Sequence, residues 1–215
     1  MPAPRLSPTA TLVLAVLLEQ PMHPYEMLVR LRKRRDDRLV RLNPGAVYHA
    51  VERLERDGLV ERAGVDRDGN RPERTVYAVT AAGVAAHDAR TRELVRDVPP
   101  EYPAFPVGLA LVHDLPRDDA LALLRERRTA LAAAVDGQRE QLDGAVARGL
   151  PRRYVLDAYY ELHQTDAQIA WLDATIADLR SGALSWTDEA SSAFRPGVAP
   201  DRPAPHPATS AEELP

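Results

Sequence analysis

Positively charged side chains gather in one stretch of the chain. Seven cations lie between Arg30 and Arg41, and only two aspartates offset them. Such a run can be solvated surface, and cations at the end of a helix complement its dipole. It is nevertheless the densest positive cluster in the sequence, and it lies directly before a helix with a polar outer face. We therefore favour contact with the phosphate groups of a nucleic acid, with Arg34 and Arg35 as the candidate residues.

The segment that follows is predicted to be a helix suited to a DNA groove. Asn43 is a good N-cap, and a proline at the first helical position costs nothing, because that N–H has no partner within the helix. Gly58 marks the end of the helix. Apolar residues recur at helical spacing on one face, and polar residues cover the other.

The polar face carries the groups that could meet base edges and phosphates. The candidates are Asn43, Ala46, Tyr48 and His49 near the start of the helix, and Arg53 farther along, where contact with the DNA backbone is expected. His49 or Arg53 taken alone could equally be ordinary surface, and the whole could be an ordinary amphipathic helix. The neighbouring elements must decide between these interpretations.

After Gly58 the pattern changes from helical to alternating period. Residues 59–65 and 75–79 are predicted strands, joined by a turn-rich tip. The candidate DNA contacts of this tip are Arg67, Asn70 and Arg71, although any one of them could belong to a simple exposed turn. Three helices followed by a two-stranded hairpin is the order of a winged helix-turn-helix. In that fold the third helix enters the major groove, and the wing reaches the minor groove or the backbone.

Two further helices must position these residues. Ser7 can cap the first, which is predicted to reach Gln20, and the second is predicted from about Pro24 to Arg34. Thr80 can cap a fourth helix after the hairpin. The chain is expected to be mainly α, with four parts: a winged helix-turn-helix DNA-binding domain at 1–80, a connecting helix at 81–98, a C-terminal helical dimerisation and effector domain at 99–180, and a largely disordered tail at 181–215.

Two long helices are predicted in the C-terminal half, at about 115–148 and 152–179. Their apolar residues recur by threes and fours, and Arg128 and Asp166 are among the residues that interrupt the pattern. An antiparallel pair of this kind has more apolar surface than it can bury on itself, and such a surplus usually means a partner. The proline-rich segment 99–106 is expected to be an irregular linker before a short helix at 107–112. In the tail, Leu184, Trp186 and Phe194 could pack as a short arm.

Composition sets limits on the function. The 215 residues carry a net charge of −4, but residues 1–98 have a balance of +3 and residues 99–215 a balance of −7. The excess positive charge therefore lies in the half that holds the candidate DNA contacts. There is no cysteine, and the apolar run near the N-terminus is too short to span a bilayer. It also lacks the features of a signal peptide, so we expect a cytoplasmic protein with no membrane partner.

Three segments resemble the PadR family of bacterial transcriptional regulators. They are Pro21–Met27, Asn43–Val60 and Arg74–Gly83. The second is the most specific, because a Gly-x-x-Tyr turn, an Arg-Leu-Glu and a Gly-Leu-Val exit coincide at the family's spacing. Pro24 departs from the family pattern, which usually has glycine at that place.

The resemblance implies a homodimeric repressor. Two recognition helices related by a two-fold axis would read half-sites about 34 Å apart on a pseudo-palindromic operator in double-stranded DNA. The resemblance also implies that the C-terminal helices and the fourth helix form the dimer. An effector, often an aromatic or phenolic molecule, binds near the dimer interface in such proteins. The family's tyrosine in the recognition helix falls on Tyr48, which by that pattern contacts phosphate or the groove wall.

A second hypothesis makes the protein chiefly a small-molecule sensor, in which DNA binding is secondary. Aromatic and imidazole side chains concentrate in the C-terminal half, where they could stack on an aromatic ligand. Aromatics at helical spacing more often fill a core or a dimer seam, and that interpretation is the stronger one. The candidate effector-binding residues are Tyr102, Tyr159, His163 and Trp171.

A third hypothesis, an enzyme, has little support. The six histidines are scattered, and the sequence holds neither a glycine-rich phosphate loop nor a serine in a nucleophile elbow. His113 with Asp114, or His163 with Asp166, could touch a metal ion, but a single pair is far more often surface or capping chemistry. We therefore expect no catalytic residues, no metal site and no cofactor.

Overall fold

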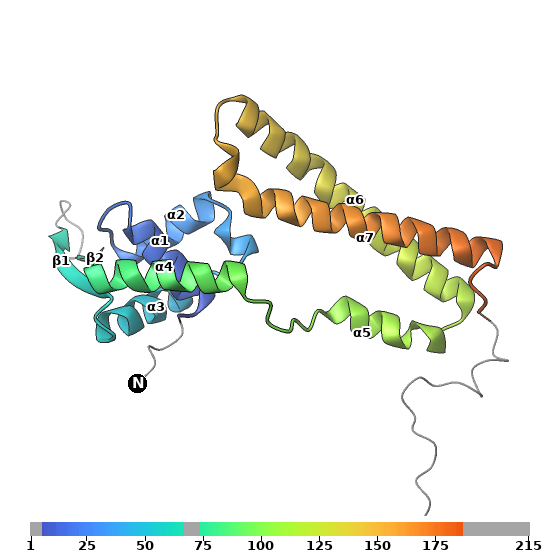
Figure 1. Cartoon of the computed structure of the whole chain (residues 1–215), viewed down its shortest axis with the longest axis horizontal. Coiled ribbons are helices and arrows are strands. Elements are labelled where there is room, and N and C mark those ends of the chain that lie inside the picture. The colour runs from blue at the N-terminus through green and yellow to red at the C-terminus, as the bar shows by residue number, and fades with distance from the viewer. Residues whose placement is uncertain (1–5, 67–73, 187–215) are drawn as a thin grey trace, which may run out of the picture. The chain divides into compact units, whose positions relative to one another are not determined.

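A computed structural model of the protein describes residues 6–66 and 74–186 (Figure 1). The chain divides into two compact units, Met1–Glu101 and Tyr102–Pro215, and each is described by itself. The predicted mainly α fold with a two-stranded wing is confirmed. The first unit contains α1 (Pro8–Leu17), α2 (Pro24–Lys33), the 3₁₀ turn η1 (Asp36–Arg38), α3 (Pro44–Arg56), β1 (Val60–Asp66), β2 (Arg74–Val79) and α4 (Ala81–Arg96). The second contains α5 (Ala104–Leu111), η2 (Val112–Asp114), α6 (Arg117–Ala147), η3 (Arg152–Val155) and α7 (Leu156–Ser181).

Three helices of the first unit begin at the residues that the sequence indicated. Ser7, Asn43 and Thr80 are the N-caps of α1, α3 and α4. Each side-chain oxygen accepts the backbone N–H three residues on, at 3.2, 2.8 and 3.1 Å. These bonds satisfy donors that have no partner inside a helix, so the caps fix where each helix starts.

The start of α2 resolves the departure at Pro24. Pro24 is the first residue of the helix, a position that tolerates proline because no intrahelical bond uses its nitrogen. His23 precedes it as the N-cap, a role that the sequence analysis did not assign. The local geometry is therefore that of an ordinary capped helix start.

The wing strands β1 and β2 pair antiparallel, from Val60 opposite Val79 outward to Asp66 opposite Arg74. A bulge between Arg62 and Gly64 shifts the register by one residue. On the other side of β2, Tyr77 exchanges two backbone hydrogen bonds of 3.1 Å with Met22, which ties the wing to the segment before α2.

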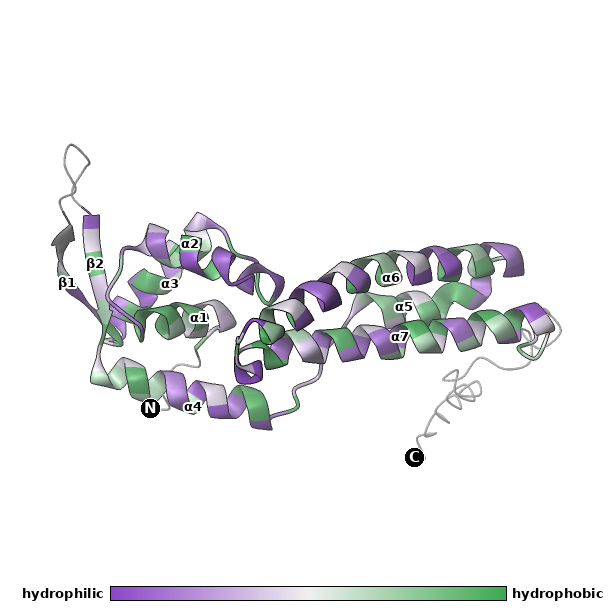
Figure 2. Cartoon of the chain, turned by 90° about the horizontal axis from the view of Figure 1, so that it is seen from above, coloured by the Kyte–Doolittle hydropathy of each residue, from purple (hydrophilic) through white to green (hydrophobic). Residues whose placement is uncertain are grey.

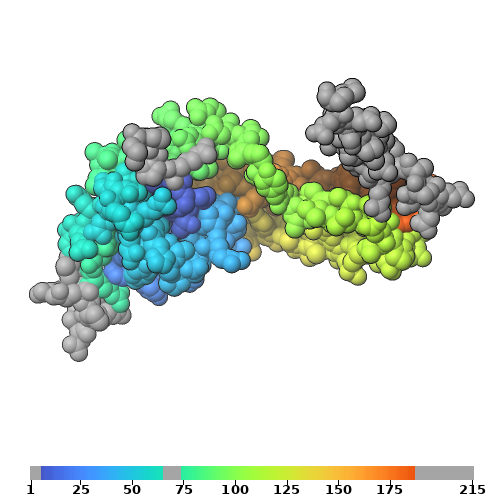
Figure 3. All heavy atoms as spheres, turned by 90° about the horizontal axis from the view of Figure 1, so that it is seen from below, coloured from blue at the N-terminus to red at the C-terminus, as the bar shows by residue number. Residues whose placement is uncertain are grey.

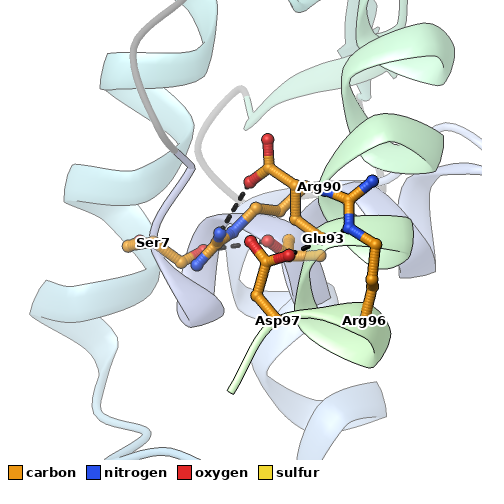
Figure 4. A network of polar contacts seen from close by, with 6 residues as sticks. Ser7, Arg90, Glu93, Arg96 and Asp97 are labelled. Carbon is orange, nitrogen blue, oxygen red and sulfur yellow. Dashed lines mark hydrogen bonds and ion pairs between the residues drawn. The ribbon is translucent and has the colours of Figure 1, made fainter. Parts of the chain in front are cut away.

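One continuous core fills the first unit. Its sixteen buried side chains come from α1, α2, α3, the segments that flank them and the first part of the wing, and α1 contributes Val13, Leu14 and Val16 with no exposed surface. Helix α4 lies against α1. Near its end, Arg90 donates a 2.9 Å hydrogen bond to Glu93, beside the Ser7 cap of α1 (Figure 4).

The end of α3 is joined to the start of α4. Gly58, at a positive φ of 71°, ends α3, and the N–H of Leu59 returns to the carbonyl of Leu54 at 2.8 Å. The Thr80 hydroxyl donates to the Gly58 carbonyl at 2.8 Å and lies 3.1 Å from the Leu59 carbonyl oxygen. A Cβ on Gly83 would lie 2.1 Å from that same Leu59 oxygen, so only glycine fits there.

In the second unit, α6 and α7 pack antiparallel, since residues early in one helix contact residues late in the other. Helix α5 begins at Ala104, three residues before the predicted start. Pro106 lies inside its first turn, where the N–H would have no partner in any case, so the expected irregular linker ends earlier. In Figure 2 α5 is coloured almost wholly hydrophobic, and its Phe105 and Leu109 pack on one end of the α6–α7 pair.

The polar residues that interrupt the seam of α6 and α7 pair across it. Arg128 makes a two-pronged contact with Asp173 at 2.9 and 3.2 Å, and Arg139 contacts both oxygens of Asp166 at 2.7 Å. These bonds raise the pKa of both arginines, through the hydrogen bond first and the opposite charge second.

After α7 the chain turns at Gly182, which has a positive φ of 80°. The Trp186 indole donates a 3.0 Å hydrogen bond to the Leu115 carbonyl, and its ring packs on the core of the second unit. The short arm expected in this region therefore exists as far as Trp186. Phe194 and the rest of the predicted tail lie outside the described residues.

Candidate nucleic-acid interface

Helix α3 has one buried and one exposed face. Val47, Val51 and Leu54 are almost fully buried in the core of the first unit. On the opposite face Tyr48 keeps 39% of its surface exposed, and the side chain of His49 keeps 82%. Figure 3 shows residues of the α2 and α3 regions side by side on the surface of this unit. The predicted polar face is therefore exposed on the surface of this unit.

Asn43 and Ala46 lie at the N-terminal end of α3. The Asn43 side-chain oxygen is already used, because it accepts the Ala46 N–H. Its amide group can still donate, and a donor is what a phosphate or a base acceptor requires. Ala46 is half-buried, so it can offer only a small apolar surface to a base.

His49 and Arg53 are only loosely held. His49 lies 3.5 Å from Glu52 and Arg53 lies 3.9 Å from Asp57, one helical turn away in each case. Exposed pairs at such distances are weak, and either side chain can leave its partner for a phosphate.

The cationic cluster is partly neutralised within the protein. Glu19, just after α1, forms ion pairs with both Arg30 (2.8 Å) and Arg34. Arg35 follows α2 with a positive φ of 66°, a conformation unusual for a residue other than glycine, and its side chain is exposed. Of the two predicted phosphate contacts in this cluster, Arg35 is thus the more available.

The predicted wing contacts Arg67, Asn70 and Arg71 lie outside the described residues. The described part of the wing shows a contact that the sequence analysis missed. Arg62 of β1 donates a 2.7 Å hydrogen bond to Glu55 and so links the first wing strand to α3. A pair seven residues apart across a helix end has no signature in local sequence patterns.

The predicted effector residues fall into separate places. The Tyr159 hydroxyl donates to Asp143 at 2.9 Å, which raises the pKa of Tyr159, and its carbonyl oxygen lies 2.7 Å from the His163 ring nitrogen. Trp171 is three helical turns beyond Tyr159, about 18 Å along α7, and contacts Phe105 edge-on with ring centroids 6.3 Å apart. Tyr102 is 91% exposed before α5. One chain thus brings Tyr159 and His163 together, but not the four residues.

Other site types have no counterpart in the part of the chain that the structure describes. Within residues 6–66 and 74–186, no three His, Asp or Glu side chains group as metal ligands would. Nor does any helix among those residues have the length and apolar character needed to cross a membrane.

The part of the chain that forms this candidate interface is similar to a known protein family. Residues 13–89 match the transcriptional regulator PadR-like family. A comparison with curated protein sequences gave no match.

Solved structures with a similar fold extend over most of the chain. Bacillus subtilis PadR in complex with operator DNA is 15% identical, with a TM-score of 0.66 over 79% of this chain and 98% of that chain. The same protein in complex with p-coumaric acid is 15% identical, with a TM-score of 0.64 over 80% and 98%. The PadR-like regulator BC1756 from Bacillus cereus is 12% identical, with a TM-score of 0.57 over 81% and 99%. The TM-scores show that these proteins share the fold of this chain, and at identities this low the likeness extends to the fold alone.

Proposed function

Because the chain belongs to the transcriptional regulator PadR-like family, we propose that it is a homodimeric repressor that binds a pseudo-palindromic operator and is released by a small aromatic molecule. Members of this family regulate transcription and are not enzymes, which agrees with the expectation of no catalytic residues. The observation that carries the proposal is the exposed polar face of α3, held over a complete hydrophobic core beside a wing.

DNA recognition is proposed to divide between α3, the wing and the cationic cluster. Tyr48, His49 and the free amide of Asn43 would meet base edges and nearby phosphates in the major groove, with Ala46 against a base. Arg35 and Arg53 would contact the DNA backbone, and Arg34 would do so by exchanging Glu19 for a phosphate. The wing residues Arg67, Asn70 and Arg71 would reach the neighbouring minor groove or backbone.

Dimerisation is proposed to involve the second unit and α4. Large apolar side chains remain exposed on these helices in the single chain, among them Val95 (83%), Tyr160 (64%), Leu156 (59%) and Trp171 (46%). Apolar surface spread over long helices favours an isologous interface with a second copy. Two α3 helices related by a two-fold axis would then reach half-sites about 34 Å apart.

The effector is proposed to be a small aromatic molecule. B. subtilis PadR has been solved with p-coumaric acid, and in this chain Tyr159, His163, Trp171 and Tyr102 are the candidate contacts. Because one chain does not gather them, they could form one site only across the dimer. Titration of Trp171 and Trp186 fluorescence with phenolic acids should show saturable quenching and loss of DNA binding. An unchanged signal and unchanged DNA binding would refute an aromatic effector of this type.

The decisive experiment is selection of bound fragments from a genomic DNA library, followed by mobility shifts on the selected operator at several salt concentrations. Tyr48→Ala and Arg71→Ala should weaken binding by about ten- to a hundredfold, since each good contact is worth roughly 1–3 kcal/mol. Arg125→Ala, which removes an exposed charge from α6, is the matched control and should bind like the wild type. Failure to enrich any fragment at low salt would exclude the DNA-binding proposal.

A further inference from the structure

His23 lies where three elements of the first unit meet. It immediately precedes α2, and its neighbour Met22 is fixed to Tyr77 of β2 by two backbone hydrogen bonds of 3.1 Å. Its ring meets Tyr48 of α3 edge-on, with ring centroids 6.1 Å apart and planes at 76°. Tyr48 is one of the proposed DNA contacts, and His23 touches it from outside α3.

The imidazole of His23 acts as a hydrogen-bond acceptor in this arrangement. Its Nδ1 accepts the backbone N–H of Tyr25 at 3.1 Å, and the Glu26 carboxylate accepts the backbone N–H of His23 at 3.1 Å. This reciprocal pair is a capping box, which satisfies two donors that the helix leaves open. Because Nδ1 uses its lone pair, the ring must be neutral, with its proton on Nε2.

The surroundings favour that neutral form. Partial burial, followed by the positive charge of Arg74 on β2, lowers the pKa of His23, and the negative charge of Glu26 on α2 opposes them. From α3, the titratable side chain that contacts the imidazole ring is Tyr48. A neutral ring also suits an edge-on contact with an aromatic neighbour.

We propose that His23 is a positioning residue for operator binding, because it joins the start of α2 to the DNA-contacting side chain Tyr48. In the free protein, the imidazole ring limits the orientations of the Tyr48 side chain. The hydrogen bond to Nδ1 stabilises the start of α2, which keeps the ring in place. The inference rests on the proposed function, in which Tyr48 meets the operator. Ordering a side chain in advance improves affinity by about two- to tenfold, because the conformational entropy is already lost in the free protein.

Two substitutions separate the two contacts of the imidazole. His23→Asn keeps a side-chain acceptor for the cap but removes the ring. His23→Phe keeps an aromatic ring against Tyr48 but removes the acceptor. Affinity for the selected operator fragment and the melting temperature are measured for both variants, in the wild-type and the Tyr48→Ala backgrounds.

We expect His23→Asn to weaken operator binding about two- to tenfold while the melting temperature stays unchanged. In the Tyr48→Ala background the same substitution should have no further effect, because its target is absent. The dependence of affinity on salt should stay the same, since no cation is lost, whereas Arg35→Ala should reduce the slope by about one. His23→Phe should show the opposite pattern, with a lower melting temperature and a smaller loss of affinity.

The outcomes distinguish this inference from the proposed function. If the wild type enriches no DNA, the proposed function fails. If the wild type binds but His23→Asn binds equally well, or loses as much affinity in the Tyr48→Ala background, then only the inference is overturned. A measurement on the wild type covers the case in which both variants unfold: nuclear Overhauser effects between the His23 and Tyr48 rings are expected, and their absence would overturn the inference.

Discussion

The two units of this protein bury their apolar side chains in different ways. In the first, sixteen buried residues form a single cluster around α1. In the second, the buried residues of the packed helices form two separate clusters, one around Leu172 and Leu179 and the other around Val135 and Leu162. Large apolar side chains of α5, α6 and α7 remain exposed in the single chain. The first unit thus has one core of its own, whereas the core of the second is divided, and its exposed apolar side chains are part of the surface that the proposed homodimer would cover.

Both tryptophans, Trp171 and Trp186, belong to the second unit. Their fluorescence therefore follows the unfolding of that unit, while far-ultraviolet circular dichroism follows the helices of both. The two signals allow each substitution to be assigned to one unit.

The largest effect is expected from a cavity in the first core. Leu31→Ala removes a fully buried side chain of α2 and should lower the free energy of unfolding by about 2–5 kcal/mol. The dichroism transition should shift while the fluorescence transition stays in place. Glu61→Gln, at an exposed side chain of β1, is the control and should change stability by less than about 0.5 kcal/mol. A parallel shift of both signals would mean that the units unfold as one.

A smaller loss is expected at the joint between α3 and α4. Gly83→Ala places a methyl group 2.1 Å from the Leu59 carbonyl oxygen, which is backbone and cannot move alone. Overpacking of this kind costs about 1–3 kcal/mol. Only the dichroism transition should respond. An unchanged transition would show that the first unit is looser around α4 than the structure indicates.

The opposite sign is expected for a glycine of the second unit. Gly137 lies inside α6, and a Cβ there would meet no atom within 4 Å. Gly137→Ala should raise the free energy of unfolding by about 0.8–1 kcal/mol, because alanine is the better helix former. The fluorescence transition should move upward. A loss of stability there would indicate that a partner chain packs against this position in the dimer.

The smallest effect is a pH dependence of the first unit. The pKa of His23 is lowered from its ordinary value of 6.5, mainly by burial, so the folded state takes up a proton less readily than the unfolded chain. The stabilisation is fully present above pH 6.5 and is lost as the pH falls from there through the folded pKa. The dichroism midpoint of the wild type, which matches that of His23→Asn at pH 7.5, should therefore fall below it as the pH is lowered to 5. A constant difference between the two proteins would contradict this assignment.

Local signals in the sequence predicted the helix starts well. Ser7, Asn43 and Thr80 each cap a helix through a bond to the third residue on, and such a bond depends only on neighbours in the chain. The His23 cap was missed because histidine is not among the usual capping residues. The early start of α5 was missed because proline was taken as a break, whereas the first turn of a helix accepts it.

Contacts between distant residues were beyond the sequence analysis. Arg128 and Asp166 were recognised as interruptions of the α6 and α7 seams, but their partners, 45 and 27 residues away, follow only from the register of the packed pair. The same holds for Arg62 with Glu55 and for the T-shaped contact of His23 with Tyr48. The candidate DNA residues and the effector residues stay predictions until a complex is measured.

The joint at Leu59 has a consequence for how a signal could reach DNA. The carbonyl of Leu59 is contacted by Thr80 and crowded by Gly83, so the last turn of α3 and the first turn of α4 are held against the same few atoms. Helix α4 is also the route by which the polypeptide leaves the first unit. A displacement of α4 would therefore act directly on the end of α3 through these atoms. If α3 binds the operator as proposed, its position can be altered through α4, with no change in any of the candidate DNA contacts.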